Sequence, residues 1–247
     1  MSDGLLIPDW DGLLIPGVQA MVTTRESLHG VSTMPYAQFN VASHVGDDPA
    51  AVAANRAQLR ALLPNEPLWL NQVHGVAVVA VESATQGVSA DASVARTPGA
   101  VCAVMTADCL PLLLAAEDGS AVAAAHAGWR GLADGVIEAT VAALELPGDR
   151  LVAWLGPAIG PDAFEVGDEV RAAFCRCDAR AASAFHPQGS GKWLCDLYTL
   201  ARQRLGALGV ERVFGGKFCT HRDARRFYSY RRDGPTGRMV TLIWREE

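Results

Sequence analysis

Two continuous apolar runs separated by a short polar segment stand out in the middle of the chain. The runs LPLLLAA at 110–116 and AVAAAHA at 121–127 flank the acidic, glycine-bearing segment Glu117–Ser120. Apolar runs of this length, bounded by turn residues, are typical of buried strands. The pattern therefore predicts a buried hairpin in which Cys109 and His126 lie at the same end, close to one another.

Further strands and helices are predicted on both sides of this hairpin. Four or five short strands occur with little helix between them, which favours a mixed or antiparallel sheet over regular βαβ alternation. We expect an α+β fold with mixed β-sheets flanked by helices. The expected strands are 18–25, 68–70, 76–81, 91–94, 101–106, 151–155, 210–214 and 239–244, and the expected helices are 49–63, 131–146, 167–175 and 193–208.

Charge and cysteine usage narrow the class of protein. The 247-residue chain is half hydrophobic, with a net charge of −6 and a pI near 5.5. Such a chain has no overall field that favours nucleic acid or an anionic membrane, so an anionic substrate needs local arginines. Six cysteines are spread without the rhythm of a disulfide framework, which indicates thiols or ligands in a reducing compartment.

The ends and the longest apolar runs predict a cytoplasmic protein. The N-terminus lacks a basic segment followed by a long apolar core, so we expect no secretory signal. No apolar run approaches the roughly 18 residues of a membrane span. We expect one domain over residues 1–247, with a disordered or extended segment at 1–17, acting as a monomer or homodimer without nucleic-acid or membrane partners.

The predicted hairpin end carries the candidate chemistry. A thiol and an imidazole that converge at the end of a buried sheet form either a metal site or a Cys-His pair. His74, in the run NQVHG, is placed by its neighbouring glycine on a turn at a sheet edge. Taken alone, such a histidine is more often structural or exposed than a ligand.

Two arginine-bearing segments could hold an anion. Arg130 lies in AGWRG at a strand-to-helix junction, where a guanidinium and a helix N-terminus both favour negative charge. The segment 218–238 interleaves arginines with Phe227, Tyr228 and Tyr230. Such a segment could stack on a base and hold phosphate or sugar, or form a solvated cationic face. We take Arg130, Tyr230 and Arg231 as candidate substrate-binding residues.

Several co-linear runs give a specific resemblance. The runs NQVHG, TADCLPLLLA, AAHAGWRG, GPAIGPDAFEV and FYSYRRDGPTGR resemble the YfiH family, long labelled polyphenol oxidase or laccase-like and later assigned purine nucleoside phosphorylase activity, over Phe39 to the C-terminus. The resemblance implies a single α+β domain of the CNF-like/YfiH-like putative cysteine hydrolase fold. It implies a catalytic zinc on His74, Cys109 and His126, phosphorolysis of adenosine, inosine, guanosine and methylthioadenosine, and an accompanying adenosine deaminase activity.

The residue chemistry is consistent with that expectation. Zinc takes nitrogen and thiolate ligands, and three protein ligands leave a fourth position open, as in catalytic sites. Phosphorolysis requires phosphate behind C1′ of the ribose, and Arg130 and Arg231 are candidates for holding it. No His-x-Glu or Pro-Cys-x-x-Cys deaminase signature is present. Asp91 and Asp108 are the candidate acid/base residues.

The residues are also compatible with three other functions. Two histidines and a cysteine also suit a blue-copper centre, but a multicopper oxidase needs a further histidine cluster. Cys109 and His126 could form the nucleophile and base of a metal-free hydrolase. A structural zinc in a peptidoglycan-precursor editing factor would require a fourth protein ligand. The histidines left for a second copper cluster are few, namely His29, His44, His186 and His221.

Overall fold

The computed structural model describes residues 4–247, and its elements form the α+β arrangement that the sequence predicts. The strands are β1 (Val18–Val22), β2 (Val78–Ala80), β3 (Ala92–Ala95), β4 (Val101–Thr106), β5 (Leu110–Ala116), β6 (Val122–Ala127), β7 (Leu151–Leu155), β8 (Glu165–Gly167), β9 (Phe185–Gly189), β10 (Lys192–Cys195), β11 (Arg212–Gly215) and β12 (Met239–Arg245). The helices are α1 (Pro49–Arg60), α2 (Trp129–Asp134), α3 (Val136–Leu144), α4 (Asp168–Cys177), α5 (Leu197–Ala207) and α6 (Tyr230–Asp233), with 3₁₀ turns at Gly148–Arg150 and Ala179–Ala184.

The predicted hairpin lies at the centre of a six-stranded mixed sheet. The strand order is β11-β7-β5-β6-β3-β2, and β5 and β6 pair antiparallel with Leu110 opposite Ala127. β7 pairs antiparallel with β5, whereas β11 is parallel to β7 and β2 is parallel to β3. The central position of β5 and β6 explains why both are continuous apolar runs.

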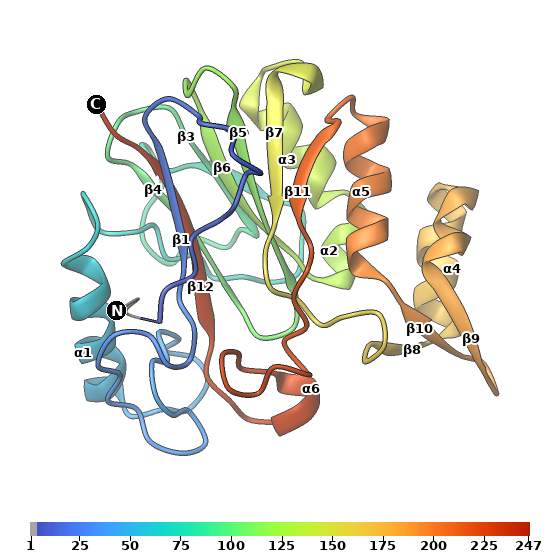
Figure 1. Cartoon of the computed structure of the whole chain (residues 1–247), viewed down its shortest axis with the longest axis horizontal. Helices are drawn as coiled ribbons and strands as arrows, with labels where there is room; N and C mark the ends of the chain where they lie inside the picture. Colours follow the sequence, from blue (N-terminus) through green and yellow to red (C-terminus); the bar gives the residue numbers. More distant parts are fainter. Residues whose placement is uncertain (1–3) are drawn as a thin grey trace.

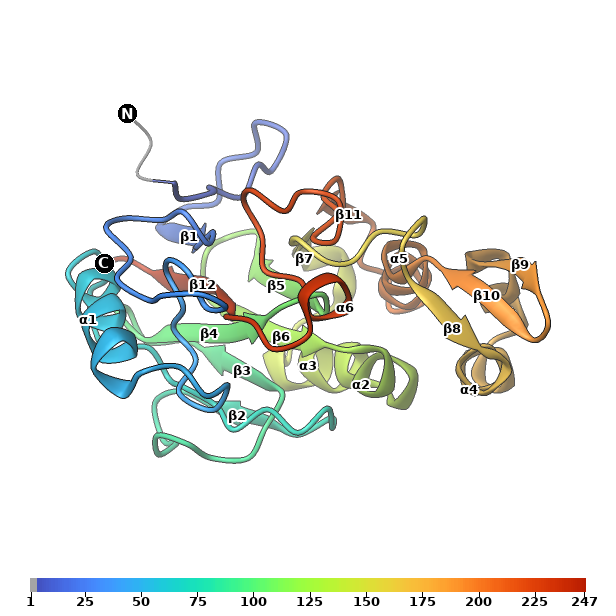
Figure 2. The same cartoon turned by 90° about the horizontal axis from the view of Figure 1, so that it is seen from below.

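Both faces of this sheet are covered. The three-stranded sheet β1-β12-β4 packs on one face, and α2, α3 and α5 cover the other (Figures 1 and 2). Alternate residues of β5 enter the two cores, with Leu112 and Leu114 facing the helices and Leu113 facing the second sheet. A strand buried on both faces loses the apolar-polar alternation of a half-exposed strand.

The helix α1 covers the outer face of the second sheet. It begins at the predicted proline, and the Asp48 carboxylate caps it by accepting a hydrogen bond from the Ala50 amide at 2.9 Å. Leu59 of α1 packs with Met105 and Leu242 in the core beneath. α1 ends at Arg60, before the predicted Leu63.

The prediction of one continuous helix at 131–146 is wrong. The structure has α2 and α3 in its place, separated at Gly135, whose φ of 105° is a left-handed conformation that ends a helix. The first helix also begins earlier than predicted, at Trp129.

Two further predictions differ from the structure. The expected helix at 193–208 begins only at Leu197, because Asp196 caps it and Lys192–Cys195 instead pairs as β10 with β8 and β9. These strands and α4 form an outlying unit, at the right of Figure 1. The expected strand at 68–70 makes one isolated bridge, from Leu68 to Cys102.

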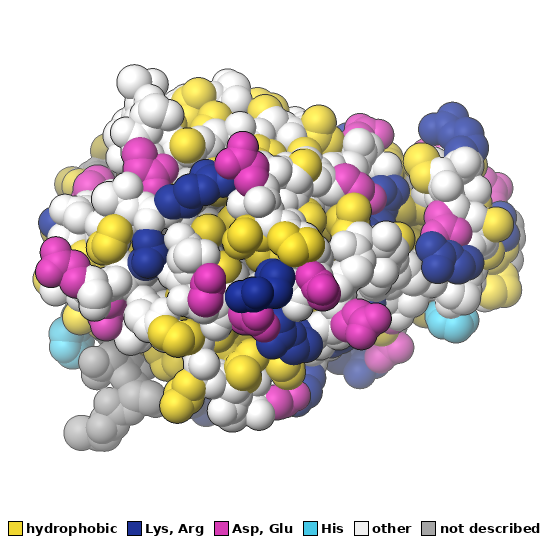
Figure 3. All heavy atoms as spheres, turned by 90° about the horizontal axis from the view of Figure 1, so that it is seen from above, with side chains coloured by type: hydrophobic (Ala, Val, Ile, Leu, Met, Phe, Trp, Pro, Cys, Tyr) yellow, Lys and Arg dark blue, Asp and Glu magenta, His cyan; other side chains and the backbone are white. Residues whose placement is uncertain are grey.

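The N-terminal segment is packed where it is described. Leu6 forms a bridge with Val22, and Ile15 is buried against the core between the sheets. The expectation of a disordered or extended segment at 1–17 includes residues 1–3, which lie outside the described residues. No helix within residues 4–247 is long and apolar enough to cross a membrane. On the face shown in Figure 3, acidic and basic side chains are interspersed.

Candidate functional site

The end of the β5–β6 hairpin brings a thiol and an imidazole together. Cys109 immediately precedes β5, and His126 lies in β6 opposite Pro111. Asp108 turns the chain from β4 into β5 with a φ of 91°, a strained value for a residue with a side chain. The hairpin register therefore produces the convergence that the apolar runs predict.

His74 reaches the same point from the loop before β2. Its φ is 60°, and the amides of Val73, His74 and Gly75 all donate hydrogen bonds to the carboxylate of Asp91, at 3.2, 2.9 and 2.7 Å. One buried carboxylate thus fixes the backbone that presents His74. Asp91 adjoins the N-terminal end of β3, which pairs with β6.

Asp91 also orients the second histidine. Its Oδ1 lies 2.8 Å from Nδ1 of His126. A carboxylate at Nδ1 fixes the orientation of the ring and directs Nε2 away from Asp91, as is usual for metal-bound histidines. Burial raises the pKa of Asp91, but contacts with His126 and the loop amides outweigh it, so the pKa is lowered overall.

The three side chains form a compact donor set. Their ligand atoms lie within 4.8 Å of one another, and Cys109 Sγ lies 3.8 Å from His74 Nε2. Two ligands on a tetrahedral zinc are separated by about 3.5 Å, given zinc bonds of roughly 2.0–2.3 Å. The donor types and separation fit a zinc or copper ion held by His74, Cys109 and His126.

The electrostatics of the set favour a thiolate. Burial opposes ionisation of Cys109, but the charge and hydrogen bonds of the two histidines lower the pKa of its thiol to about 6. The pKa of His126 is raised, because Cys109 and Asp91 together outweigh the effect of burial. A thiolate is the form of cysteine that binds metal or attacks carbon.

The glycines of AGWRG keep space open beside the donor set. A Cβ on Gly128 would lie 2.8 Å from Cδ2 of His74 and 3.1 Å from Sγ of Cys109. A Cβ on Gly131 would lie 2.7 Å from the carbonyl oxygen of Gly75. A larger residue at either position would clash, because α2 and the residue before it pack closely against the His74 loop.

The donor set forms part of the wall of a cavity of about 290 Å³, hereafter the metal cavity. The side chain of Gln72 is fixed there by two 2.8 Å hydrogen bonds with the backbone of Met105. Tyr230, at the start of α6, lines the same cavity as His126 of β6, and Figure 2 shows α6 beside the end of β6. The lining residues are His44, Gln72, His74, Met105, Thr106, Ala107, Cys109, His126, Tyr230 and Arg238.

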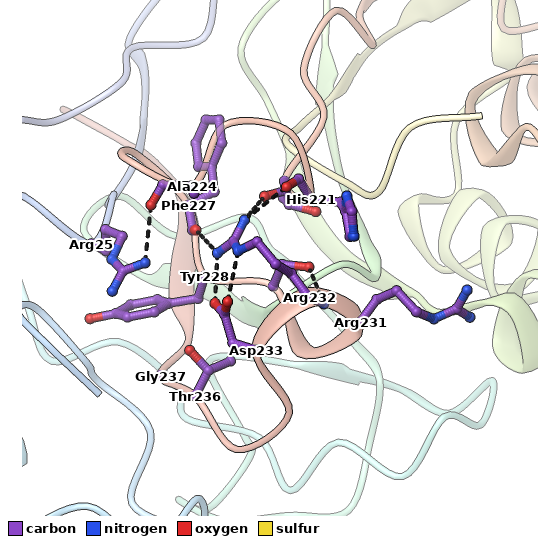
Figure 4. Close-up of polar contacts among 12 residues, drawn as sticks. Arg25, His221, Ala224, Phe227, Tyr228, Arg231, Arg232, Asp233, Thr236 and Gly237 are labelled. Carbon is purple, nitrogen blue, oxygen red and sulfur yellow. Dashed lines mark hydrogen bonds and ion pairs between the residues drawn. The ribbon is translucent and has the colours of Figure 1, made fainter. Parts of the chain in front are cut away.

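Several polar side chains of the arginine-aromatic segment, residues 218–238, bind the backbone and side chains of the segment itself (Figure 4). Arg232 pairs with Asp233 and donates to the carbonyls of Thr220, His221 and Phe227. Phe227 and Tyr228 are buried, so they are not available to stack on a ligand. Arg232, Phe227 and Tyr228 therefore stabilise the segment, although the sequence suggests that such residues contact substrate.

The three candidate substrate-binding residues occupy different positions. Tyr230 is exposed and lines the metal cavity. The Arg231 guanidinium donates to the Glu165 carbonyl and lies over the ring of Phe164, and Arg130 lies over the ring of Trp129. Neither arginine side chain lines the metal cavity.

Both candidate acid/base residues are engaged in holding the site. Asp108 accepts hydrogen bonds from Thr220 Oγ1 at 2.6 Å and from the Arg231 amide at 2.8 Å. These bonds tie the turn before Cys109 to the C-terminal segment. Asp91 is likewise occupied by the His74 loop and His126, so each carboxylate positions the site.

Two ionisable residues of the cavity wall, His44 and Arg238, are not among the predicted site residues. Arg238 is partly buried, and its pKa is lowered by burial despite the nearby acidic groups Cys109 and Asp108. His44 faces it, and burial, Arg238 and Arg56 lower the pKa of His44. Arg238 ends the run FYSYRRDGPTGR, and His44 follows Phe39, where the resemblance to the YfiH family begins, so the resemblance could have indicated both residues.

Comparison with known proteins places this geometry in a family. Residues 19–246 match the family described as multi-copper polyphenol oxidoreductase laccase. A Pseudomonas aeruginosa protein named purine nucleoside phosphorylase is 54% identical over 98% of both chains. The Escherichia coli protein named purine nucleoside phosphorylase YfiH is 51% identical, over 97% of this chain and 98% of its own.

Solved structures agree with the fold. A Neisseria meningitidis protein is 49% identical and superposes with a TM-score of 0.93, over 99% of this chain and 100% of its own. A Bacillus licheniformis hypothetical protein YfiH is 26% identical, with a TM-score of 0.86 over 93% of both chains. The chain is therefore an enzyme that belongs to the YfiH family of laccase-like proteins.

Proposed function

We propose that the protein is a zinc-dependent purine nucleoside phosphorylase with an adenosine deaminase side activity. It would convert adenosine, inosine, guanosine or methylthioadenosine and phosphate to the base and ribose 1-phosphate. The observation that supports this proposal is one cavity that combines the His74, Cys109 and His126 donor set with the partly buried cation Arg238. Two relatives named purine nucleoside phosphorylase support the phosphorolysis.

Arg238 is the best-placed residue to hold phosphate in this cavity. Its Nη1 is bonded to the carbonyls of Thr236 and Gly237, which fix the guanidinium and leave Nη2 available. A desolvated guanidinium forms strong charge-assisted hydrogen bonds with phosphate oxygens. Arg130 and Arg231 remain candidates only through a rearrangement that brings their side chains into the cavity.

The bound zinc would supply a Lewis acid beside the nucleoside, for both phosphorolysis and deamination. The residues around the cavity position the zinc ligands and the nucleoside. Asp91 holds both histidines, Gly128 leaves room for the donor set, and Tyr230 lines the cavity. The six cysteines are all free, which supports the expectation of a cytoplasmic enzyme. The enzyme would act as a monomer or homodimer.

A Cys-His hydrolase is the second candidate, because His126 and His74 lower the pKa of the Cys109 thiol and Cys109 Sγ lies 3.8 Å from His74 Nε2. A copper polyphenol oxidase is less well supported, since within residues 4–247 the one group of metal-ligating side chains is His74, Cys109 and His126. The same three-ligand count weighs against a structural zinc in a peptidoglycan-precursor editing factor, which would need a fourth ligand.

The direct test is chromatography of the products formed from adenosine by the zinc-loaded protein, with and without phosphate. Adenine formed only with phosphate supports phosphorolysis, and inosine formed in either case supports deamination. The Cys109→Ala variant serves as the control for catalysis by a contaminant. Absence of both products from the zinc-loaded protein would overturn the purine assignment, and inactivation by iodoacetamide that chelators do not affect would favour the hydrolase.

A further inference from the structure

A second cavity, of about 500 Å³, adjoins the metal cavity. His44 and Met105 line both cavities, so only these side chains are shared between their walls. The proposed function gives the second cavity no role. Its other lining residues are Ser43, Arg56, Glu66, Trp69, Leu70, Asn71, Gln86 and Gly87.

Arg56 is the cation of the second cavity. It projects from α1, and its guanidinium lies 3.9 Å from the centroid of the Trp69 ring. Its Nε donates to the Val41 carbonyl at 2.7 Å, while Nη1 and Nη2 have no hydrogen-bond partner within residues 4–247. The guanidinium is thus held in place by stacking and one hydrogen bond, with two nitrogens free to bind a ligand.

The neighbouring charges leave this cavity suited to an anion. Glu66 also lines it, but its Oε1 accepts a hydrogen bond from Trp69 Nε1 at 2.7 Å and its Oε2 lies 3.9 Å from Arg60 Nε. Arg238 lies on the other side of His44, and both arginines act on the His44 ring. The second cavity is therefore lined by one cation with free nitrogens and one carboxylate that already has partners, and Arg238 adds positive charge from the adjoining metal cavity.

We propose that the second cavity is a phosphoryl subsite of the same binding site. It would take the phosphate group of a purine nucleoside 5′-monophosphate whose base and ribose lie in the metal cavity. This inference rests on the proposed function for the nucleoside's place. The fixed fork of Arg56 matches the geometry of phosphate oxygens, and the shared wall at His44 and Met105 allows one ligand to extend between the cavities.

Calorimetry tests this subsite without any turnover. AMP, adenosine and inorganic phosphate are titrated into the zinc-loaded wild-type protein and into Arg56→Gln and Arg225→Gln. Arg225 is the matched control, because it is an exposed arginine that pairs with Glu26 and lines neither cavity. Arg56→Lys retains the charge and shows whether the fork geometry matters.

We expect the wild-type protein to bind AMP more tightly than adenosine. Arg56→Gln should weaken AMP binding by about 10-fold or more, the usual loss for a charge-assisted hydrogen bond, and leave adenosine binding within about 2-fold. Arg225→Gln should leave both unchanged. Equal binding of AMP and adenosine by wild type, or equal weakening of both in Arg56→Gln, would overturn the nucleotide subsite.

The phosphate titration separates the two sources of a phosphoryl group. If Arg56→Gln weakens inorganic phosphate binding but does not alter AMP relative to adenosine, the cavity takes free phosphate and the nucleotide assignment is wrong. If adenosine is not phosphorolysed but AMP binding still depends on Arg56, the proposed function fails and the subsite stands. Circular dichroism of each variant establishes that it is folded.

Discussion

Oδ1 of Asp91 lies 2.8 Å from Nδ1 of His126, while the same carboxylate accepts hydrogen bonds from the amides around His74. Two of the three side chains of the candidate metal site therefore depend on one buried residue. Because His74 lies in a loop and His126 in a central strand, Asp91 sets the distance between them.

Replacing Asp91 by Asn should weaken zinc binding. The amide cannot accept all four hydrogen bonds as a carboxylate does, and loss of such an outer partner usually costs about 10–100-fold in metal affinity. Competition with a chromogenic chelator measures the change. Asp118→Asn, in the exposed β5–β6 turn, is the control. Wild-type zinc affinity in Asp91→Asn would contradict the assigned role.

Replacing Gly128 by Ala should damage the donor set directly. The added methyl group would lie 2.8 Å from His74 and 3.1 Å from Cys109, so at least one ligand must move. The backbone angle itself is ordinary, with φ at −60°, so strain is not the cause. We expect zinc affinity to fall by at least about 10-fold, as for other disturbances of metal-ligand geometry.

A matched control for this substitution is Gly206→Ala, because a Cβ there meets nothing within 4 Å. Gly206 lies in α5, where alanine favours the helix by up to about 1 kcal/mol. The control should keep full zinc affinity. Unaltered zinc binding by Gly128→Ala would show that the donor set tolerates the methyl group.

The reactivity of Cys109 should report its lowered pKa in the metal-free protein. Because the pKa is about 6, the thiolate is already formed above about pH 7, and it is lost as the pH falls through 6. The rate of alkylation by iodoacetamide should therefore rise between pH 5 and 7, on the order of 10-fold, and then level off. Mass spectrometry of the Cys109 peptide at each pH measures that rate.

An ordinary cysteine gives the contrasting profile. Its rate would continue to rise toward pH 9, because its unperturbed pKa is about 8.5. The Cys109→Ala variant should lose the fast component. A Cys109 rate that keeps rising beyond pH 8 would show that the histidines do not stabilise the thiolate.

The central hairpin could be predicted from sequence because its signal is local. The runs at 110–116 and 121–127 are apolar throughout, so they indicate buried strands, and the short connection fixes which ends meet. The strand Lys192–Cys195 was missed because it depends on a tertiary contact, the pairing of β10 with β8 and β9. The break at Gly135 comes from the left-handed conformation of that glycine, whereas the apolar residues on both sides of it, Leu132 and Val136, fit the pattern of one continuous helix.

The cavity wall was harder to predict than the donor set. Cysteine and histidine indicate a metal site by residue type alone. The type of residue does not show which arginine of a basic segment lines a cavity and which one binds the protein backbone. Arg232 holds carbonyls, Arg231 extends toward Glu165, and Arg238 lines the metal cavity. Only the fold of the segment, anchored by Asp108 and Asp233, distinguishes these roles.

The arginines therefore give the sharpest test of where phosphate binds. Arg238→Gln should raise the KM for phosphate by about 10-fold or more, since it removes a desolvated cation from the wall that carries Cys109 and His126. Arg231→Gln and Arg130→Gln should change it by less than about 3-fold, because exposed arginines contribute little. Initial rates of adenine release at varied phosphate measure all three. A larger effect at Arg231 or Arg130 than at Arg238 would show that the segment rearranges on binding and that the phosphate lies outside the wall described here.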